Sequence, residues 1–275
     1  DRLAARLAQL VVLHSTMPHI SLYNGKGQAN IIILGNSRAY RHIDEKMLAD
    51  ATGETVKNYA MPAAGGLFLS TILQDYIDHY GAPERVLLEP SALAFDDDQL
   101  IAHRWFRHMS TNMDAALHQV DERLWWAGNV LNLIDMNSLA FLNNLHKVFS
   151  HYQHSFREGT VEKNVEIPEN NDYLKPSEDG RSAFQNIVSL SNQYGFALDI
   201  VFTPLHPKFR DIQTEYSASQ LKSWISGKAP GARILSLENS ISGTGYFADL
   251  THLNEDGKNI LMEELLPYFK ADRRS

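Results

Sequence analysis

Apolar runs of strand length alternate with amphipathic segments of helix length in two parts of the chain. The run at 31–34, Ile-Ile-Ile-Leu, is short, β-branched and followed by Gly35, which is typical of a strand buried in a parallel sheet. Runs of this kind predict strands at 31–34, 55–60, 85–88, 197–203 and 233–237. Amphipathic periodicity and flanking glycines predict helices at 1–15, 43–51, 65–80, 178–194, 209–226 and 255–270. This alternation indicates βαβ crossovers, so we expect a three-layer α/β fold in which helices cover both faces of a five-stranded parallel sheet.

The alternation breaks between the third and fourth predicted strands. Residues 92–156 are predicted to be mostly helical and are rich in aromatic side chains and histidine. Residues 157–178 are polar, contain two prolines and are predicted to form a loop. We therefore expect one α/β domain over 1–275, with a helical insertion at about 92–178. No apolar run approaches the roughly 18–20 residues that a transmembrane helix needs.

Candidate chemistry lies at the carboxyl ends of the strands, where open parallel sheets bind ligands. Ser37 follows the first strand on a tight turn into a helix, where backbone amides and the helix dipole favour negative charge. His252 and Asp249 lie three residues apart in the loop before the last helix, and Gly65 follows the second strand. Serine catalysis needs a nucleophile, a base, a group that orients the base and donors for an oxyanion. The joint placement predicts Ser37 as nucleophile, His252 as base and Asp249 as its orienting group, with the amides of Ser37 and Gly65 as oxyanion donors.

Two of these motifs resemble those of the SGNH, or GDSL-like, hydrolase superfamily. Gly35-Asn36-Ser37 is similar to the block with the nucleophilic serine, and the Asp-x-x-His at 249–252 is similar to the block before the last helix. The resemblance covers roughly 30–90 and 197–270 and leaves out the insertion. It implies a flavodoxin-like three-layer fold and a Ser-His-Asp triad that forms an acyl-enzyme.

The chain departs from the family pattern at two blocks. Asn36 stands where the family usually has Asp, and the third block has Leu88-Glu89-Pro90-Ser91 in place of a Gly-x-Asn whose Asn completes the oxyanion hole. Together with the Thr-Pro-x-His-Pro at 203–207, this is similar to divergent extracytoplasmic SGNH-like proteins of bacterial polysaccharide and cell-envelope acylation. Alginate acetylation proteins and the teichoic-acid alanylation protein belong to that group.

The resemblance implies a serine esterase or O-acyltransferase for acyl, preferably acetyl, esters of a bacterial envelope or exported polysaccharide. Its partners would be an acylated glycan or acyl donor and a membrane-bound acyltransferase. The alternative is a catalytically degenerate module that binds a glycan or an assembly partner. A nucleotide-binding function is ranked last, because the chain has neither Gly-x-Gly-x-x-Gly nor a Gly-Lys-Ser/Thr loop.

Three further residues and the histidines of the insertion are candidates for binding or chemistry. Arg38, beside the nucleophile, is a substrate-binding candidate for an acidic sugar or phosphate, or a solvated surface side chain. His206 is a second substrate-binding candidate, or a capped loop histidine between two prolines. Glu89 is a weaker candidate for the base than His252. The insertion histidines, such as the pair His151 and His154, have helical spacing but lack the Glu-flanked metalloprotease pattern, so we expect no metal and no cofactor.

Composition narrows the function class. The net charge is −8 and basic residues are scattered among acidic ones, which disfavours nucleic acid as a partner. The absence of cysteine excludes a thiol nucleophile and weakly favours an oxidising compartment. The sequence begins at Asp1 instead of Met, so we expect an upstream signal peptide or membrane anchor and an extracytoplasmic location, periplasmic or at the cell surface.

Overall fold

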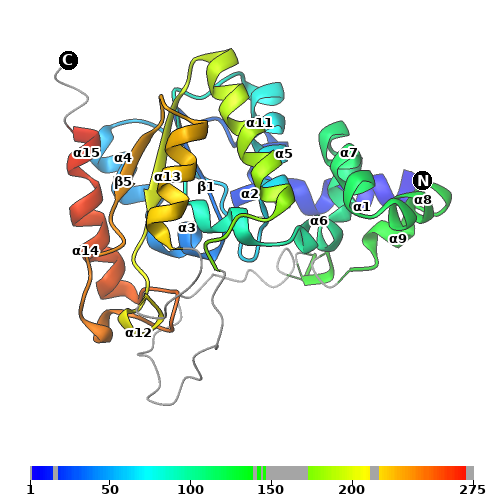
Figure 1. Ribbon diagram of the computed structural model, residues 1–275. Coiled ribbons are helices and arrows are strands. Elements are labelled where there is room, and N and C mark those ends of the chain that lie inside the picture. Colours follow the sequence, from blue (N-terminus) through cyan, green and yellow to red (C-terminus); the bar gives the residue numbers. More distant parts are fainter. Residues whose placement is uncertain are drawn as a thin grey trace.

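The computed structural model describes residues 2–14, 18–138, 141–143, 145–146, 173–210 and 217–270. A five-stranded, all-parallel sheet with the order β2-β1-β3-β4-β5 lies at its centre (Figure 1). The strands are β1 (Ile31–Leu34), β2 (Val56–Asn58), β3 (Arg85–Leu88), β4 (Ala197–Phe202) and β5 (Arg233–Ser236). This order is that of the flavodoxin-like doubly wound fold. The predicted five-stranded parallel α/β architecture is therefore confirmed.

The sheet is buried on both faces, as β1 shows. Ile32 and Leu34 point into one apolar core, and Ile31 and Ile33 point into a second core on the opposite face. Successive side chains of a strand alternate between faces, so an uninterrupted apolar run fits only a strand that is covered on both sides.

Helices on either face of the sheet complete the three layers (Figure 1). The first core is covered by α5 (Gly66–Tyr80), α11 (Glu178–Tyr194) and α13 (Ala218–Lys228). The second is covered by α3 (Ser37–His42), α4 (Glu45–Thr52), α14 (Glu255–Leu265) and α15 (Pro267–Lys270). The amino-terminal α1 (Arg2–His14), α2 (Pro18–Ser21) and η1 (Leu22–Asn24) also contribute side chains to the first core.

Three predicted helices differ from the structure at their ends. The helix expected at 43–51 is α4, and a separate α3 precedes it because Ile43 and Asp44 are extended and Asp44 caps the start of α4. The helix expected at 255–270 is divided into α14 and α15 before Pro267, whose ring removes a backbone donor. The segment expected at 209–226 contains α12 (Pro207–Arg210) and α13, and residues 211–216 lie outside the described residues.

The segment after β3 forms a series of short helices, seen at the amino-terminal end of the molecule in Figure 1. They are η2 (Pro90–Ala94), α6 (Asp98–Ala102), η3 (Arg104–His108), α7 (Thr111–Val120), α8 (Glu122–Val130) and α9 (Leu133–Met136). Trp105 and Phe106 are fully buried and belong to the same core as β1 and α5. The pair His151 and His154 lies outside the described residues, which leave out 147–172. Most of the loop predicted at 157–178 also lies outside them.

Within the described ranges, no helix combines the length and the apolar character that crossing a membrane requires.

The two ends of this segment meet at a close contact between helices. The backbone N–H of Ser177, just before α11, donates to the carbonyl of Leu93 in η2 at 3.0 Å. A Cβ added to Gly180 would lie 1.9 Å from the Leu93 oxygen, and one added to Gly66 would lie 2.8 Å from the Gly180 Cα. The first turns of α5 and α11 therefore approach at a distance that only glycine allows.

We predict that Gly180→Ala lowers the free energy of unfolding by about 3 kcal/mol, because the new methyl group would overlap backbone atoms that have no room to move. Gly227→Ala is the matched control: Gly227 also lies in a helix, and its added Cβ would meet no atom within 4 Å. The control is expected to be neutral or to stabilise by up to about 1 kcal/mol. Urea unfolding of both variants checks this, and equal effects would contradict the close contact.

Candidate active site

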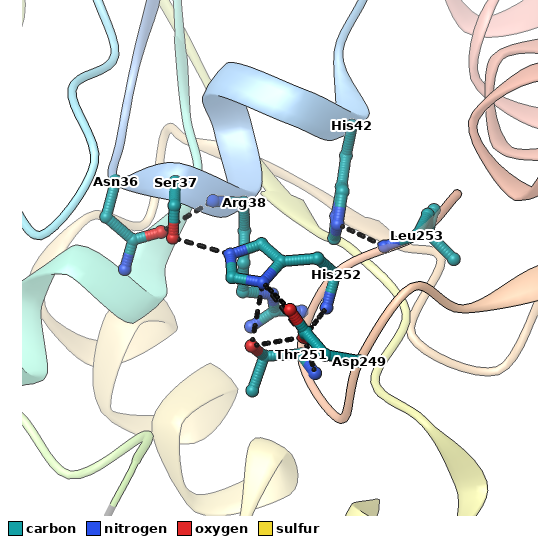
Figure 2. Close-up of polar contacts among 8 residues, drawn as sticks. All are labelled: Asn36, Ser37, Arg38, His42, Asp249, Thr251, His252 and Leu253. Atoms are coloured by element: carbon teal, nitrogen blue, oxygen red, sulfur yellow. Dashed lines mark hydrogen bonds and ion pairs between the residues drawn. The ribbon is translucent and has the colours of Figure 1, made fainter. Parts of the chain in front are cut away.

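The turn from β1 into α3 places Ser37 at the first position of a helix. Gly35 is required here by space, since an added Cβ would lie 2.5 Å from the Ala39 Cβ and 3.0 Å from the Glu89 Cβ. The Asn36 side chain caps α3 by accepting the backbone N–H of Arg38 at 3.0 Å. Ser37 therefore sits at the carboxyl end of β1 with its hydroxyl facing the loop 248–252 (Figure 2).

The structure brings together the three side chains predicted as a triad. His252 Nε2 lies 2.7 Å from Ser37 Oγ, and His252 Nδ1 lies 2.8 Å from Asp249 Oδ2 (Figure 2). Both distances are hydrogen bonds, so the three side chains form an unbroken relay from hydroxyl to carboxylate. The serine and the histidine come from opposite ends of the chain and meet because both loops lie at the carboxyl edge of the sheet.

Asp249 is held in the form that the relay needs. Partial burial by itself raises the pKa of Asp249, but hydrogen bonds from His252 and Thr251 outweigh it and hold that pKa far below its usual range. An ionised carboxylate accepts the proton of His252 Nδ1, which leaves a lone pair on Nε2 to accept the Ser37 hydroxyl proton. The backbone N–H groups of Thr251 and His252 also donate to Asp249 Oδ1, each at 2.9 Å.

The two amides predicted as oxyanion donors are available. Over the described residues, neither the Ser37 N–H nor the Gly65 N–H donates a hydrogen bond to another protein group. The Met61 amide donates to the Gly35 carbonyl at 3.0 Å, which brings the loop before Gly65 alongside the turn that carries Ser37. Gly65 leaves no room for a side chain, because an added Cβ would lie 2.6 Å from Asp97 Oδ1. The oxyanion role of the two amides stays a prediction.

Arg38 does not face the solvent, contrary to one of the two sequence interpretations. Its side chain is 2% exposed and its Nη1 lies 3.2 Å from Glu89 Oε1. Its Nη2 donates to the carbonyls of Thr203 and Pro204, and the Tyr173 ring lies over the guanidinium at 5.7 Å from the ring centroid. We therefore correct the interpretation of Arg38 as a solvated surface side chain: it is a buried cation that contacts a carboxylate and two carbonyls. Its substrate-binding role stays a prediction.

Glu89 is the ion-pair partner of Arg38, an interaction that the sequence did not predict. It is 1% exposed, accepts the hydroxyl proton of Ser91 at 2.5 Å and faces Arg38, so it is not placed as a competing base. Ser91 in turn accepts the side-chain amide of Asn36 at 2.9 Å. The unusual third block, Glu89-Pro90-Ser91, thus supports the turn that carries Ser37. Burial raises the pKa of Glu89, although Arg38 and Ser91 oppose that effect.

The His206 side chain caps the turn that leads into α12, which was one of its two sequence interpretations. It is 1% exposed, and its Nδ1 accepts the backbone N–H of Lys208 at the start of α12, at 3.2 Å. Its ring packs edge-on against Phe247, with 5.2 Å between centroids. The buried side chain that caps a turn agrees with the interpretation of His206 as a capped loop histidine. Its substrate-binding role stays a prediction.

No group of side chains with the composition of a metal site occurs in the described part of the chain.

No protein-family model matches the chain, and no curated protein sequence matches it. One similar solved structure, from Streptococcus pneumonia, carries the provisional name platelet activating factor. It is 13% identical, covers 98% of this chain and 99% of its own, and has a TM-score of 0.45. At these values the likeness carries no argument about activity.

We predict that Arg38→Met lowers the free energy of unfolding by about 3 kcal/mol near neutral pH, because it leaves the buried Glu89 carboxylate without its counter-charge. The folded-state pKa of Glu89, already raised by burial, rises further in this variant. A carboxyl with a raised folded-state pKa contributes stability at low pH that is lost as the pH rises through that pKa, so the deficit grows as the pH rises from the acidic range to neutral.

Adding Glu89→Gln to Arg38→Met removes the unpaired charge and is expected to restore part of the stability and to abolish the added pH dependence. Urea unfolding of the single and double variants over this pH range provides the measurement. An Arg38→Met protein that is as stable as the wild type at every pH would contradict the buried pair.

Proposed function

We propose that the protein is a serine esterase or O-acyltransferase that forms an acyl-enzyme on Ser37. The observation that carries this proposal is the relay Ser37 Oγ–His252 Nε2–Asp249, with both hydrogen bonds at 2.7–2.8 Å. A hydroxyl nucleophile needs a base within hydrogen-bond reach and a group that orients the base, and all three are present in one arrangement.

In the first half-reaction, the Ser37 oxygen attacks the carbonyl carbon of an ester while His252 Nε2 takes the hydroxyl proton. The negative charge on the carbonyl oxygen is stabilised by the amides of Ser37 and Gly65, which have no acceptor among the described residues. Asp249 stabilises the imidazolium that forms. When the tetrahedral intermediate collapses, the bond to the leaving alcohol breaks and His252 returns the proton to that oxygen.

In the second half-reaction, a hydroxyl attacks the carbonyl carbon of the Ser37 acyl ester while His252 takes its proton. The bond between the acyl group and Ser37 Oγ then breaks, and His252 returns the proton to Oγ. Water as the attacking group gives an esterase, and a sugar hydroxyl gives an O-acyltransferase. The proposed substrates are acyl, preferably acetyl, esters of a bacterial envelope or exported polysaccharide, with an extracytoplasmic location and a membrane-bound acyltransferase as partner. This choice of substrate, location and partner rests on the resemblance of the two motifs to SGNH-like proteins.

We predict that Ser37→Ala lowers hydrolysis of p-nitrophenyl acetate by at least about 1,000-fold and abolishes labelling by a fluorophosphonate probe, because both reactions need the Ser37 oxygen. Ser240→Ala, which alters a loop serine outside the relay, is the control and should keep both activities. Ser37→Ala with full esterase activity would contradict the proposal. A wild type that is neither active nor labelled, yet binds glycan, would favour a binding module instead.

We predict that Asp249→Asn lowers kcat by about 1,000- to 10,000-fold with little change in KM. An asparagine amide can present a donor to His252 Nδ1, which moves the imidazole proton to Nε2 and removes the lone pair that faces Ser37. Steady-state kinetics with p-nitrophenyl acetate, with circular dichroism to check folding, is the measurement. A fall in KM alone, or no change, would exclude Asp249 as the orienting group.

A further inference from the structure

Two side chains on the buried face of α3 form polar contacts with the residue that follows β4. Arg38 and His42 lie one helical turn apart, and both reach Thr203, the residue after β4. Arg38 donates to the Thr203 carbonyl, and His42 Nδ1 lies 3.0 Å from the Thr203 hydroxyl oxygen. His42 is fully buried, and no step of the proposed reaction uses it.

The second ring nitrogen of His42 contacts the loop of the candidate base. The backbone N–H of Leu253 donates to His42 Nε2 at 3.0 Å (Figure 2). A nitrogen that accepts an N–H must carry a lone pair, so the His42 proton is on Nδ1, where it is donated to Thr203. His42 is therefore a neutral imidazole whose two nitrogens have opposite roles.

The surroundings of His42 favour this neutral form. Burial lowers the pKa of His42 well below its usual range, and the charges of Arg38, His252 and Arg41 lower it further, while Asp249 opposes them. A protonated ring would set a second N–H against the N–H of Leu253. The contact to the loop thus depends on the ring remaining uncharged.

This contact lies directly beside the relay. Leu253 follows His252 in the chain, so its N–H belongs to the peptide group that begins at the carbonyl of His252. The rings of His42 and His252 pack edge-on, with 6.2 Å between centroids and 76° between planes. One short helix therefore holds the same loop at two points: Ser37 bonds the His252 ring, and His42 bonds the backbone next to it.

We infer that His42 is a positioning residue for the proposed reaction, which fixes His252 at hydrogen-bond distance from Ser37 through its acceptor bond to the Leu253 N–H. This inference rests on the proposed function. If the inference holds, the rate depends on the hydrogen bond from the Leu253 N–H to His42 Nε2 and not on the contact between His42 Nδ1 and Thr203.

Two amide variants separate the two links. In His42→Gln, the side-chain oxygen can reach the place of Nε2 and accept from Leu253, whereas in His42→Asn the shorter amide reaches only the place of Nδ1, next to Thr203. We expect His42→Gln to keep kcat within about 10-fold of the wild type. We expect His42→Asn to lose about 100-fold in kcat with KM changed by less than about 2-fold, as for a misplaced base. His19→Asn is the matched control: His19 is also a buried histidine and packs on Phe106, and it should leave kcat unchanged.

The measurements are kinetics with p-nitrophenyl acetate and proton NMR of the low-field His252 Nδ1–H signal. This signal should be preserved in His42→Gln and shifted or broadened in His42→Asn. Equal kcat in the two variants, or a signal that is identical in both, would overturn the inference, as would nitrogen-15 NMR that places the His42 proton on Nε2. If the wild type shows no turnover, the proposed function fails, while the NMR comparison still tests the role of His42.

Discussion

The buried ion pair between Arg38 and Glu89 is the interaction on which the candidate site depends. It joins the helix that starts at Ser37 to the end of β3, and the same guanidinium also reaches the Thr203 carbonyl at the end of β4. Two charges that are almost fully removed from water are stable only when each faces the other. Arg38 Nη2 and Glu89 Oε2 have further hydrogen bonds, whereas the buried Arg38 Nε has no hydrogen-bond partner among the described residues. A rotation of α3 that displaced Ser37 would break this pairing, so the position of Ser37 follows from an electrostatic constraint beneath it.

The helix α3, which begins at Ser37, is too short to be stable by itself. It has six residues, and isolated helices of that length do not form in water. Its structure comes from tertiary contacts at both ends: Asn36 caps the start, and the Asn58 side chain donates to the carbonyls of Ala39 and Ile43 at the end, each at 3.1 Å. On its inner face, Arg38 and His42 bind the ends of β3 and β4 and the loop at Leu253. The first turn is thus fixed by tertiary contacts, and the Ser37 hydroxyl is held at hydrogen-bond distance from His252.

Local patterns in the sequence were sufficient for the sheet and for the three residues of the relay. The bounds of β1 and β3 matched the predicted strands, because buried strands carry a strong signal in consecutive apolar residues, four in β1 and three in β3. Ser37 and His252 could be paired because the ends of parallel strands share one edge. Arg38 was misjudged, since an arginine beside a turn is usually solvated and its partner Glu89 lies on another strand end. Likewise, the role of His42 depends on Thr203 and Leu253, which no spacing in the sequence connects to it.

The hydrogen bond between Ser177 and Leu93 has a consequence for the segment between these two residues. The chain leaves the sheet after β3 and returns to α11 at almost the same place, so the segment between these residues is a closed excursion. The entropy of closing such a loop grows only slowly with its length. Loop closure therefore places little constraint on the length of this segment. The constraint comes instead from its buried side chains, such as Trp105 and Phe106, which pack in the same core as β1 and α5.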